Sequence, residues 1–149
     1  MPIIDIAIPD NALSAKAKQE MPSILGQIAL EYEGLAGSKF AESFTWVYIH
    51  ELPSANVTQV SGPPAKPIYR IIFTTLQTLL DDERKKKLGV DVAKAIYKME
   101  GTEWNEDEAH NRIWIFFDDV HQGDWIVGAK VNNIPDLKNK ADQERGISQ

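Results

Sequence analysis

Residues 1–8, Met1-Pro2-Ile3-Ile4-Asp5-Ile6-Ala7-Ile8, are the stretch around which the rest of the chain is organised. Ile4, Ile6 and Ile8 alternate with Ile3, Asp5 and Ala7, and this period of two predicts a strand with one strongly apolar face. Pro2 stands at the first position of that strand. A proline is tolerated there because no backbone N–H is needed for the ladder.

Pro2 is also the candidate catalytic residue. If Met1 is trimmed as an initiator methionine, Pro2 carries a free secondary amine. An α-amino group ordinarily has a pKa of about 7.7–8.0, and partial burial lowers that pKa by disfavouring the charged form. An amine that is neutral at physiological pH can act as a general base without a histidine or a carboxylate. The alternative reading is that the Met-Pro start has no chemical role.

Composition and charge exclude several classes of function. The chain of 149 residues has the length of one domain, and its net charge of −6 argues against a nucleic-acid partner. The sequence contains no cysteine, which excludes disulfides, thiolate metal sites and thiol catalysis. Its three histidines, His50, His110 and His121, lack metal-ligand spacing, so neither a metal nor another cofactor is predicted. The sequence shows neither a long apolar run nor a signal-peptide pattern, so we expect a cytoplasmic protein with no membrane partner.

Three further strands are predicted from runs rich in β-branched and aromatic residues, at 44–50, 69–76 and 112–118. A small ribbon is expected near 124–128. The first helix follows Ser14, a plausible N-cap, and Pro22 inside its apolar stripe predicts a kink or a break into two helices. The second helix follows the acidic residues 81–83 and is expected to end at Gly101.

The order strand–helix–strand therefore occurs twice, as a pseudo-repeat of residues 2–52 and 68–120. We predict an α+β fold in which two consecutive βαβ units form a four-stranded sheet with both helices on one face. Residues 1–131 would form the single domain. The polar tail of residues 132–149 is expected to pack on a neighbouring subunit. Because the second face of the sheet is left bare, we expect a homo-oligomer.

Three segments resemble the tautomerase superfamily, which includes 4-oxalocrotonate tautomerase, macrophage migration inhibitory factor, malonate semialdehyde decarboxylase and the cis-3-chloroacrylic acid dehalogenases. They are the amino-terminal proline, Ile28–Gly37 (Ile-Ala-Leu-Glu-Tyr-Glu-Gly-Leu-Ala-Gly), and the last strand from Arg112 with Asp124-Trp125 and Gly128 after it. The resemblance implies a homotrimer with one Pro2 pocket per subunit. It also implies enol–keto proton transfer on a small organic acid, such as a 2-oxo or 2-hydroxydienoic acid.

The chain departs from that family at the positions that bind substrate. Gln77 and Leu79 align where the dehalogenase and decarboxylase patterns place arginines. Tyr32 aligns with a histidine, Phe116 with a tyrosine, and the water-activating acid falls on or near Val127. A hydrolytic dehalogenase is therefore not expected. The candidate substrate-binding residues are Tyr32, Gln77, Phe116, Trp125 and Arg70.

Three hypotheses follow from the sequence. The first is a tautomerase-like enzyme, an isomerase of low activity, with Pro2 as general base. The second is a non-catalytic trimer of the same fold, with a binding or scaffold role, that has lost the carboxylate-binding arginines. The third is an unrelated ferredoxin-like sensory domain, because that fold also repeats βαβ units.

Overall fold

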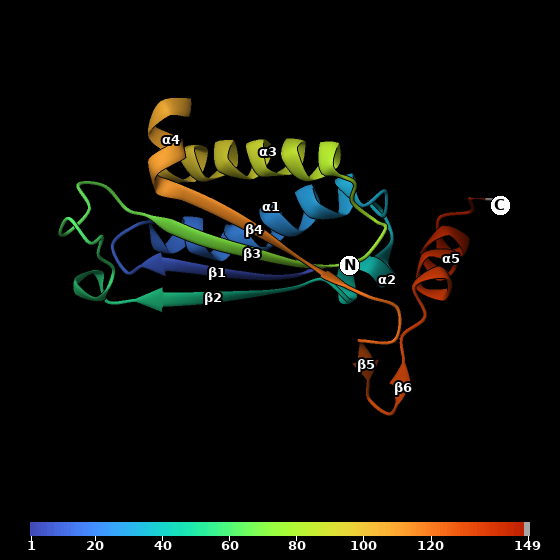
Figure 1. The fold of residues 1–149 in the computed structure, drawn as a ribbon. Coiled ribbons are helices and arrows are strands. Elements are labelled where there is room, and N and C mark those ends of the chain that lie inside the picture. Colours follow the sequence, from blue (N-terminus) through green and yellow to red (C-terminus); the bar gives the residue numbers. More distant parts are fainter. Residues whose placement is uncertain (148–149) are drawn as a thin grey trace.

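A four-stranded mixed sheet forms the centre of the structure, a computed structural model that describes residues 1–147 (Figure 1). Its strands are β1 (Ile3–Pro9), β2 (Trp46–Leu52), β3 (Tyr69–Leu76) and β4 (Ile113–Val120), in the spatial order β2-β1-β3-β4. The β1–β2 and β3–β4 pairs are parallel, and the central β1–β3 pair is antiparallel. The two βαβ units thus meet through their first strands, and the predicted α+β fold is confirmed.

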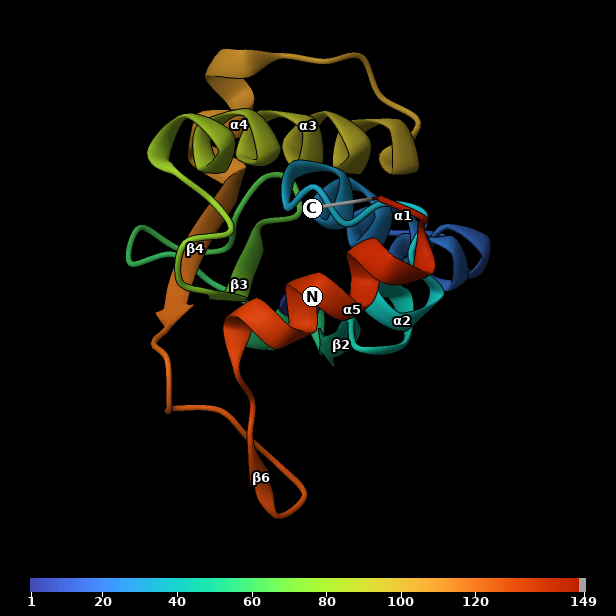
Figure 2. The same ribbon diagram turned by 90° about the vertical axis from the view of Figure 1, so that its right-hand side faces the viewer.

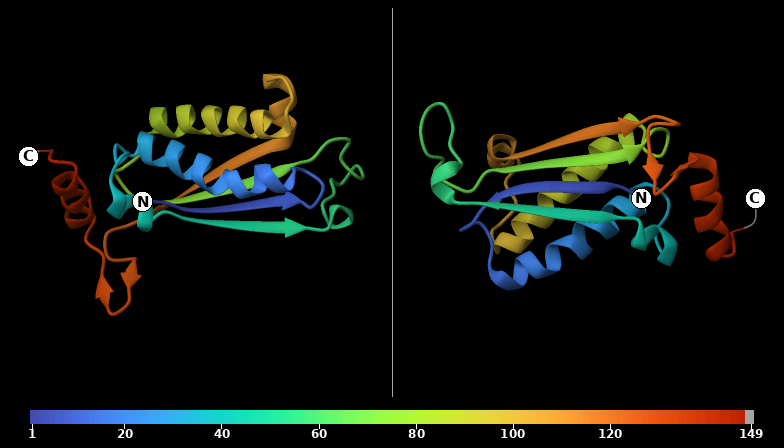
Figure 3. Two further views of the ribbon diagram at one scale, coloured as in Figure 1. Left: turned by 180° about the vertical axis from the view of Figure 1, so that it is seen from behind. Right: turned by 90° about the horizontal axis from the view of Figure 1, so that it is seen from below.

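Both long helices, α1 (Ala15–Tyr32) and α3 (Asp82–Glu100), cover the same face of the sheet (Figures 1 and 3). The Ser14 hydroxyl caps α1 by accepting the N–H of Ala17 at 3.1 Å. Asp81 caps α3, which ends at Gly101 with a φ of 72°. A break at Pro22 is not found, because α1 runs through it. Proline removes only one helical hydrogen bond, and the buried residues on either side keep the helix on the sheet.

The core lies between the sheet and these two helices. Ile4, Ile6 and Ile8 of β1 are buried there against both helices. The opposite face presents three rows of side chains across the four strands. They are Trp46–Ile3–Thr74–Asp118, Tyr48–Asp5–Ile72–Phe116 and His50–Ala7–Arg70–Trp114. We call this set the bare face, because no helix of the described residues covers it (Figure 3, right).

Several elements were not predicted from the sequence. They are α2 (Lys39–Ser43), the short 3₁₀ helix η1 (Ser54–Asn56), α4 (Glu106–Arg112) and α5 (Ile134–Glu144). The expected ribbon is found as β5 (Ile126–Val127) paired with β6 (Lys130–Val131). No helix of the described residues is long and apolar enough to cross a membrane.

Helix α5 gives the polar tail a position within its own chain. It passes beside the amino terminus and lies next to α2 (Figure 2). The Glu144 carboxylate accepts hydrogen bonds from the Ser38 hydroxyl at 2.6 Å and the Phe40 N–H at 3.0 Å. Helix α5 of the tail therefore packs on α2 of the same chain and closes the end of the sheet where β1 begins. The expected contact of the tail with a neighbouring subunit stays a prediction.

Candidate active site

The amino terminus is enclosed at that end of the sheet. Met1 is only 1% exposed, and its amino group bonds the Oε2 of Glu33, which is itself buried. Met1 belongs to an apolar cluster of buried residues that come from distant parts of the chain. The other members are Leu30, Leu35, Ala41, Leu76, Leu79, Leu137 and Ala141. Trp125 and Phe44 pack against the same cluster. We call this enclosed region the Met1 pocket.

Glu33 reaches the Met1 pocket because of the way α1 ends. The Glu33 N–H still bonds the Ala29 carbonyl at 3.0 Å, and Gly34 then adopts a φ of 71°. This left-handed turn, which glycine adopts without strain, lets the Leu35 N–H reach back to the Leu30 carbonyl at 2.8 Å. Glu33 therefore points inward with one oxygen on the Met1 amine. Its other oxygen, Oε1, is buried without a hydrogen-bond partner.

Burial governs the electrostatics of the amine. It lowers the pKa of the Met1 amino group from 8.0 to about 4, because the enclosure disfavours the charged form. Pro2 is buried next to it, and its carbonyl accepts the Trp46 N–H at 3.2 Å. While Met1 is present the Pro2 nitrogen belongs to an amide and has no basicity.

The loop after β3 borders the Met1 pocket and is strained. Thr78 has a φ of 83°, which is rare for a β-branched residue. The loop is held on both sides of Thr78, by the Gln77 N–H on the Val120 carbonyl at 2.9 Å and by Leu79 in the apolar cluster. Strain of this kind persists only where the surroundings fix it, and it is common at functional sites.

Two cavities adjoin the start of β1. One, of about 200 Å³, is lined by Ile3, Phe44, Trp46, Trp125 and the 126–128 turn. The other, of about 150 Å³, is lined by Ile3, Trp125, Asp124 and residues of β3 and β4. Trp125 and Ile3 border both. Both cavities therefore lie next to Ile3, the residue that follows Pro2.

The structure brings two of the predicted substrate-binding residues to this end of the sheet. Trp125 lies at the cavities and packs against the Met1 cluster. Gln77 follows Leu76 of that cluster, and its side-chain oxygen lies 2.8 Å from Nδ1 of His121.

The other three lie elsewhere in the single chain. Tyr32 precedes Glu33, but its hydroxyl donates to Asp91 of α3 at 2.5 Å. Phe116 and Arg70 are on the bare face. Arg70 pairs with Ala7, four residues along β1 from Ile3, so it stands well away from Pro2.

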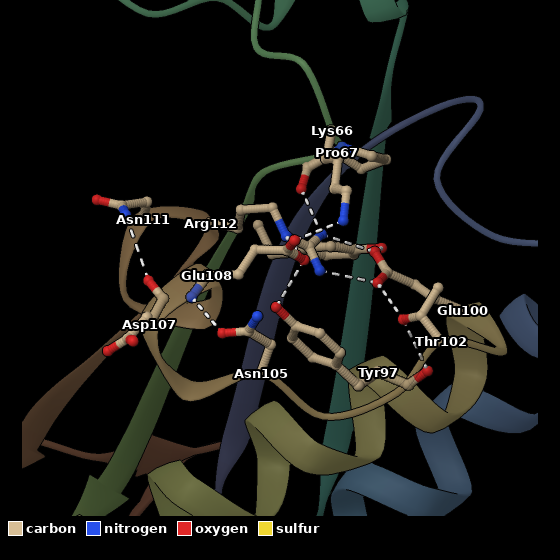
Figure 4. Close-up of polar contacts among 11 residues, drawn as sticks. Lys66, Pro67, Tyr97, Glu100, Thr102, Asn105, Asp107, Glu108, Asn111 and Arg112 are labelled. Atoms are coloured by element: carbon tan, nitrogen blue, oxygen red, sulfur yellow. Dashed lines mark hydrogen bonds and ion pairs between the residues drawn. The ribbon is translucent and has the colours of Figure 1, made fainter.

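A second buried charged cluster occupies the opposite end of the sheet (Figure 4). Arg112 donates to both oxygens of Glu100 at 2.9 Å and to the Pro67 carbonyl at 2.9 Å. The Tyr69 hydroxyl also donates to Glu100, at 2.6 Å, and the Tyr97 ring lies under the guanidinium. The Arg112 Nε lies 3.1 Å from Glu108 without hydrogen-bond geometry. These groups satisfy one another and tie α3 and α4 to the sheet, so this cluster is structural.

Met1 and Glu33 were missed at the sequence level. A glutamate at a helix end is normally solvated, and nothing local marks Glu33 as buried; its cover comes from Met1 and α5, both distant in sequence. Among residues 1–147, no arginine or lysine side chain hydrogen-bonds or ion-pairs with Met1, Pro2 or Glu33. The same residues hold no group of three or more metal-ligating side chains.

Comparisons with known proteins establish the fold. No protein-family profile and no curated protein sequence matches the chain. Among solved structures, a member of the cis-3-chloroacrylic acid dehalogenase family aligns with a TM-score of 0.71 at 7% identity, covering 93% of this chain and 89% of that one. A fused 4-OT described as an asymmetric trimer aligns with a TM-score of 0.67 at 20% identity, covering 87% of this chain and 95% of that one.

Two further structures agree with these. The macrophage migration inhibitory factor of Oncomelania hupensis gives a TM-score of 0.66 at 10% identity, covering 89% of this chain and 98% of that one. A protein inactivated by 2-oxo-3-pentynoate aligns with a TM-score of 0.68 at 15% identity, covering 87% of this chain and 94% of that one. The chain therefore has the tautomerase fold, which agrees with the family resemblance of its sequence and replaces the ferredoxin-like alternative.

Proposed function

We propose that the protein, once Met1 has been removed, is a tautomerase-like enzyme in which Pro2 is the general base. The Pro2 nitrogen would remove a proton from the carbon beside a carbonyl group and return it in the reverse step. One observation carries this proposal: Pro2 is buried beside the enclosed Met1 amine, whose pKa is lowered by burial, and burial would lower the pKa of a Pro2 amine in the same direction. An amine that is neutral at pH 7 can accept a proton there.

Substrate would enter beside Trp125 and meet Gln77 at the end of β3. Trp125 packs against the Met1 cluster, and Gln77 follows Leu76 of that cluster in the chain. The Gln77 amide, which now contacts His121, can hydrogen-bond a carbonyl group. The small 2-oxo and 2-hydroxydienoic acids implied by the family resemblance are the first compounds to test. Tyr32 would take part only if its hydroxyl left Asp91.

We further propose that the bare face is buried in a homotrimer. It exposes four large aromatic side chains, of which Trp114 is 61% and Trp46 56% exposed. Fully burying one such side chain contributes about 1.5–3 kcal/mol, so covering this face favours association. A fused 4-OT of the same fold is a trimer. In such an assembly Phe116 and Arg70, which lie on this face, would come close to a neighbouring subunit.

The oligomer is tested by placing a charge on the bare face. Trp114→Lys is expected to shift the protein toward the monomer in size-exclusion chromatography with light scattering. Val90→Lys is the matched control, because Val90 is a 39% exposed apolar residue on α3, away from the bare face. A monomeric wild type, or equal behaviour of the two variants, would contradict the trimer.

The catalytic role is tested with the natural start of the chain. Intact mass measurement first establishes whether Met1 is present. Ketonisation of phenylenolpyruvate and of 2-hydroxymuconate is then measured with Met1-free protein, with Pro2→Ala and with protein that retains Met1. We expect activity only in the Met1-free wild type, since the retained residue turns Pro2 into an amide. Equal rates for the wild type and Pro2→Ala would remove the enzymatic proposal.

A specific observation favours a second candidate, a non-catalytic trimer of the same fold. Met1 itself fills the pocket, and its amine uses the buried carboxylate that lies there. The Lys138 and Arg145 side chains of α5 are paired with Asp142 instead of facing this site. Native material that retains Met1 in every molecule would establish this second candidate.

A further inference from the structure

We propose that Glu33 is the acid partner of Pro2 and that the Met1 pocket takes an uncharged, apolar carbonyl compound. The inference rests on the proposed function and specifies its substrate class. In one direction Pro2 accepts the proton of the breaking C–H bond while the Glu33 carboxyl gives its proton to the carbonyl oxygen, which forms the enol. The reverse step returns both protons, so no oxidant, reductant or further reactant is needed.

The distances suit this pairing. Three covalent bonds of about 1.46, 1.52 and 1.33 Å join the Met1 and Pro2 nitrogens, which keeps them within about 4 Å of each other. The Glu33 carboxyl contacts the first nitrogen. It therefore lies within about 7 Å of the second, given an ordinary hydrogen-bond length. A carbonyl group and its neighbouring carbon fill such a gap when each lies about 3 Å from its catalytic group.

The position of Glu33 suits a proton donor once Met1 has been removed. Its side chain is fully buried, and its Oε1 has no hydrogen-bond partner among residues 1–147. It also follows the carboxyl end of α1, an 18-residue helix. The negative end of the helix dipole disfavours a carboxylate there. When Met1 is absent, a single proton shared between the Pro2 amine and Glu33 leaves one base and one acid in the pocket.

The same surroundings exclude a carboxylate substrate. The positions implied by the resemblance to bind a carboxylate, Gln77 and Leu79, carry no charge. Arg84, the next arginine along the chain, is half-exposed and turns to the Leu79 carbonyl and Asp81. Asp124 lines the adjoining cavity and adds a negative charge. A 2-oxo acid would therefore bring its carboxylate close to Asp124, with no cation of the same subunit to pair it.

Met1 indicates the size of the ligand. Its side chain occupies the pocket with 1% exposure, among Leu76, Leu79 and Leu137. Removal of Met1 leaves an apolar space of that length next to Pro2 and Glu33. A short alkyl or aryl group that carries an aldehyde or ketone matches this space, because its apolar part replaces the methionine side chain and its oxygen faces Glu33.

Phenylenolpyruvate and its methyl ester test the inference, because they share the reacting group and the ester, which carries one more methyl group, lacks the negative charge. With Met1-free wild type we expect kcat/KM for the ester to exceed that for the acid by at least about tenfold. Glu33→Gln should lower kcat for the ester by about 10²–10⁴-fold, the range of general acid–base catalysis. It should also bring the ester-to-acid ratio toward one. Glu31→Gln is the matched control, an exposed glutamate at the end of the same helix.

The outcomes separate the two proposals. If the acid is preferred by the wild type, or if Glu33→Gln and Glu31→Gln have the same effect, the Glu33 inference is wrong while Pro2 catalysis stands. If Pro2→Ala matches the wild type on both compounds, or the Met1-free wild type is inactive on both, the proposed function is lost and the inference with it. The ester-to-acid ratio needs only the wild type, so it decides the substrate class even if Glu33→Gln does not fold.

Discussion

The two ends of the sheet each bury a glutamate, and the two glutamates differ in their hydrogen-bond partners. Glu100 accepts two hydrogen bonds from Arg112 and a third from Tyr69. Glu33 has a single partner, the Met1 amine, and keeps one oxygen without any. The Arg112 Nε also lacks a hydrogen bond, but both oxygens of Glu100 are bonded to a cation, whereas one oxygen of Glu33 is left unsatisfied. An unsatisfied buried group is costly and calls for an explanation. The contrast marks the Met1 end as the functional one.

The largest expected effect is at the structural end. Arg112→Met should lower the free energy of unfolding by about 3–5 kcal/mol, because it leaves Glu100 buried without its cation. Urea denaturation followed by tryptophan fluorescence measures this change. Adding Glu100→Gln should restore part of the loss, since the uncompensated charge is then removed as well. A loss below about 1 kcal/mol would show that Glu100 is not held as described.

In the protein that retains Met1, Glu33→Gln should lower the free energy of unfolding by less than Arg112→Met does. Burial keeps the Met1 amine neutral near pH 7, so the substitution leaves an unpaired polar group but no uncompensated charge. The expected loss is about 1–3 kcal/mol, measured by the same denaturation. A cost equal to that of Arg112→Met would mean that the Met1–Glu33 contact is an ion pair as strong as the one at the other end, and the contrast between the ends would disappear.

The pH dependence of stability distinguishes the contribution of the Met1 amine from that of the Glu33 carboxyl. The Met1 amine has a pKa of 8.0 when free and of about 4 in the folded protein. Between these values the unfolded chain binds the additional proton, so the stability of the Met1-retaining protein should rise with pH. The slope is at most about 1.4 kcal/mol per pH unit for one proton.

Urea denaturation between pH 5.5 and 8 measures this slope. Glu33→Gln isolates the slope of the amine, because a Glu33 carboxyl that binds a proton on folding would offset this slope in the wild type. At the other end of the sheet Arg112 stays charged throughout this range, since hydrogen bonding to Glu100 raises its pKa further. A stability of Glu33→Gln that is flat or falls over the window would show that the amine is not enclosed.

Most of the fold could be predicted from the sequence, because the signals that determine its strands and helices lie close together in the chain. The alternation in β1, the Asp81 cap and Gly101 each act within a few residues of where they stand in the chain. Helix α5 was missed because its apolar stripe consists only of Ile134, Leu137 and Ala141 in a polar segment. That stripe is recognisable only when Met1, more than a hundred residues away, lies under it.

The candidate site was predictable only in part for the same reason. Pro2 follows from its position at the start of a strand, and Trp125 from the resemblance. Glu33 carries no sequence signal, because its burial is produced by the turn at Gly34 together with the cover that Met1 and α5 provide. Tyr32, one residue earlier, looked like the better candidate because it aligns with a histidine of the dehalogenases, yet its hydroxyl turns to α3.

The smallest expected effect comes from this neighbouring pair, Tyr32 and Glu33. Hydrogen bonding to Asp91 raises the pKa of Tyr32 to about 12. The bond is at the surface, so Tyr32→Phe should lower the free energy of unfolding by less than about 1 kcal/mol. A phenol whose pKa is higher in the folded state stabilises the protein below pH 10, and this contribution disappears as the pH rises through 12.

Ultraviolet titration of the phenolate checks this assignment. Asp91→Asn should return the Tyr32 pKa toward 10, its ordinary value. A Tyr32 that titrates near 10 in the wild type would mean that the hydroxyl is free to turn toward the Met1 pocket. In that event Tyr32 would regain the substrate-binding role that its alignment suggests, and Glu33 would not be the only residue of this pair to face the substrate.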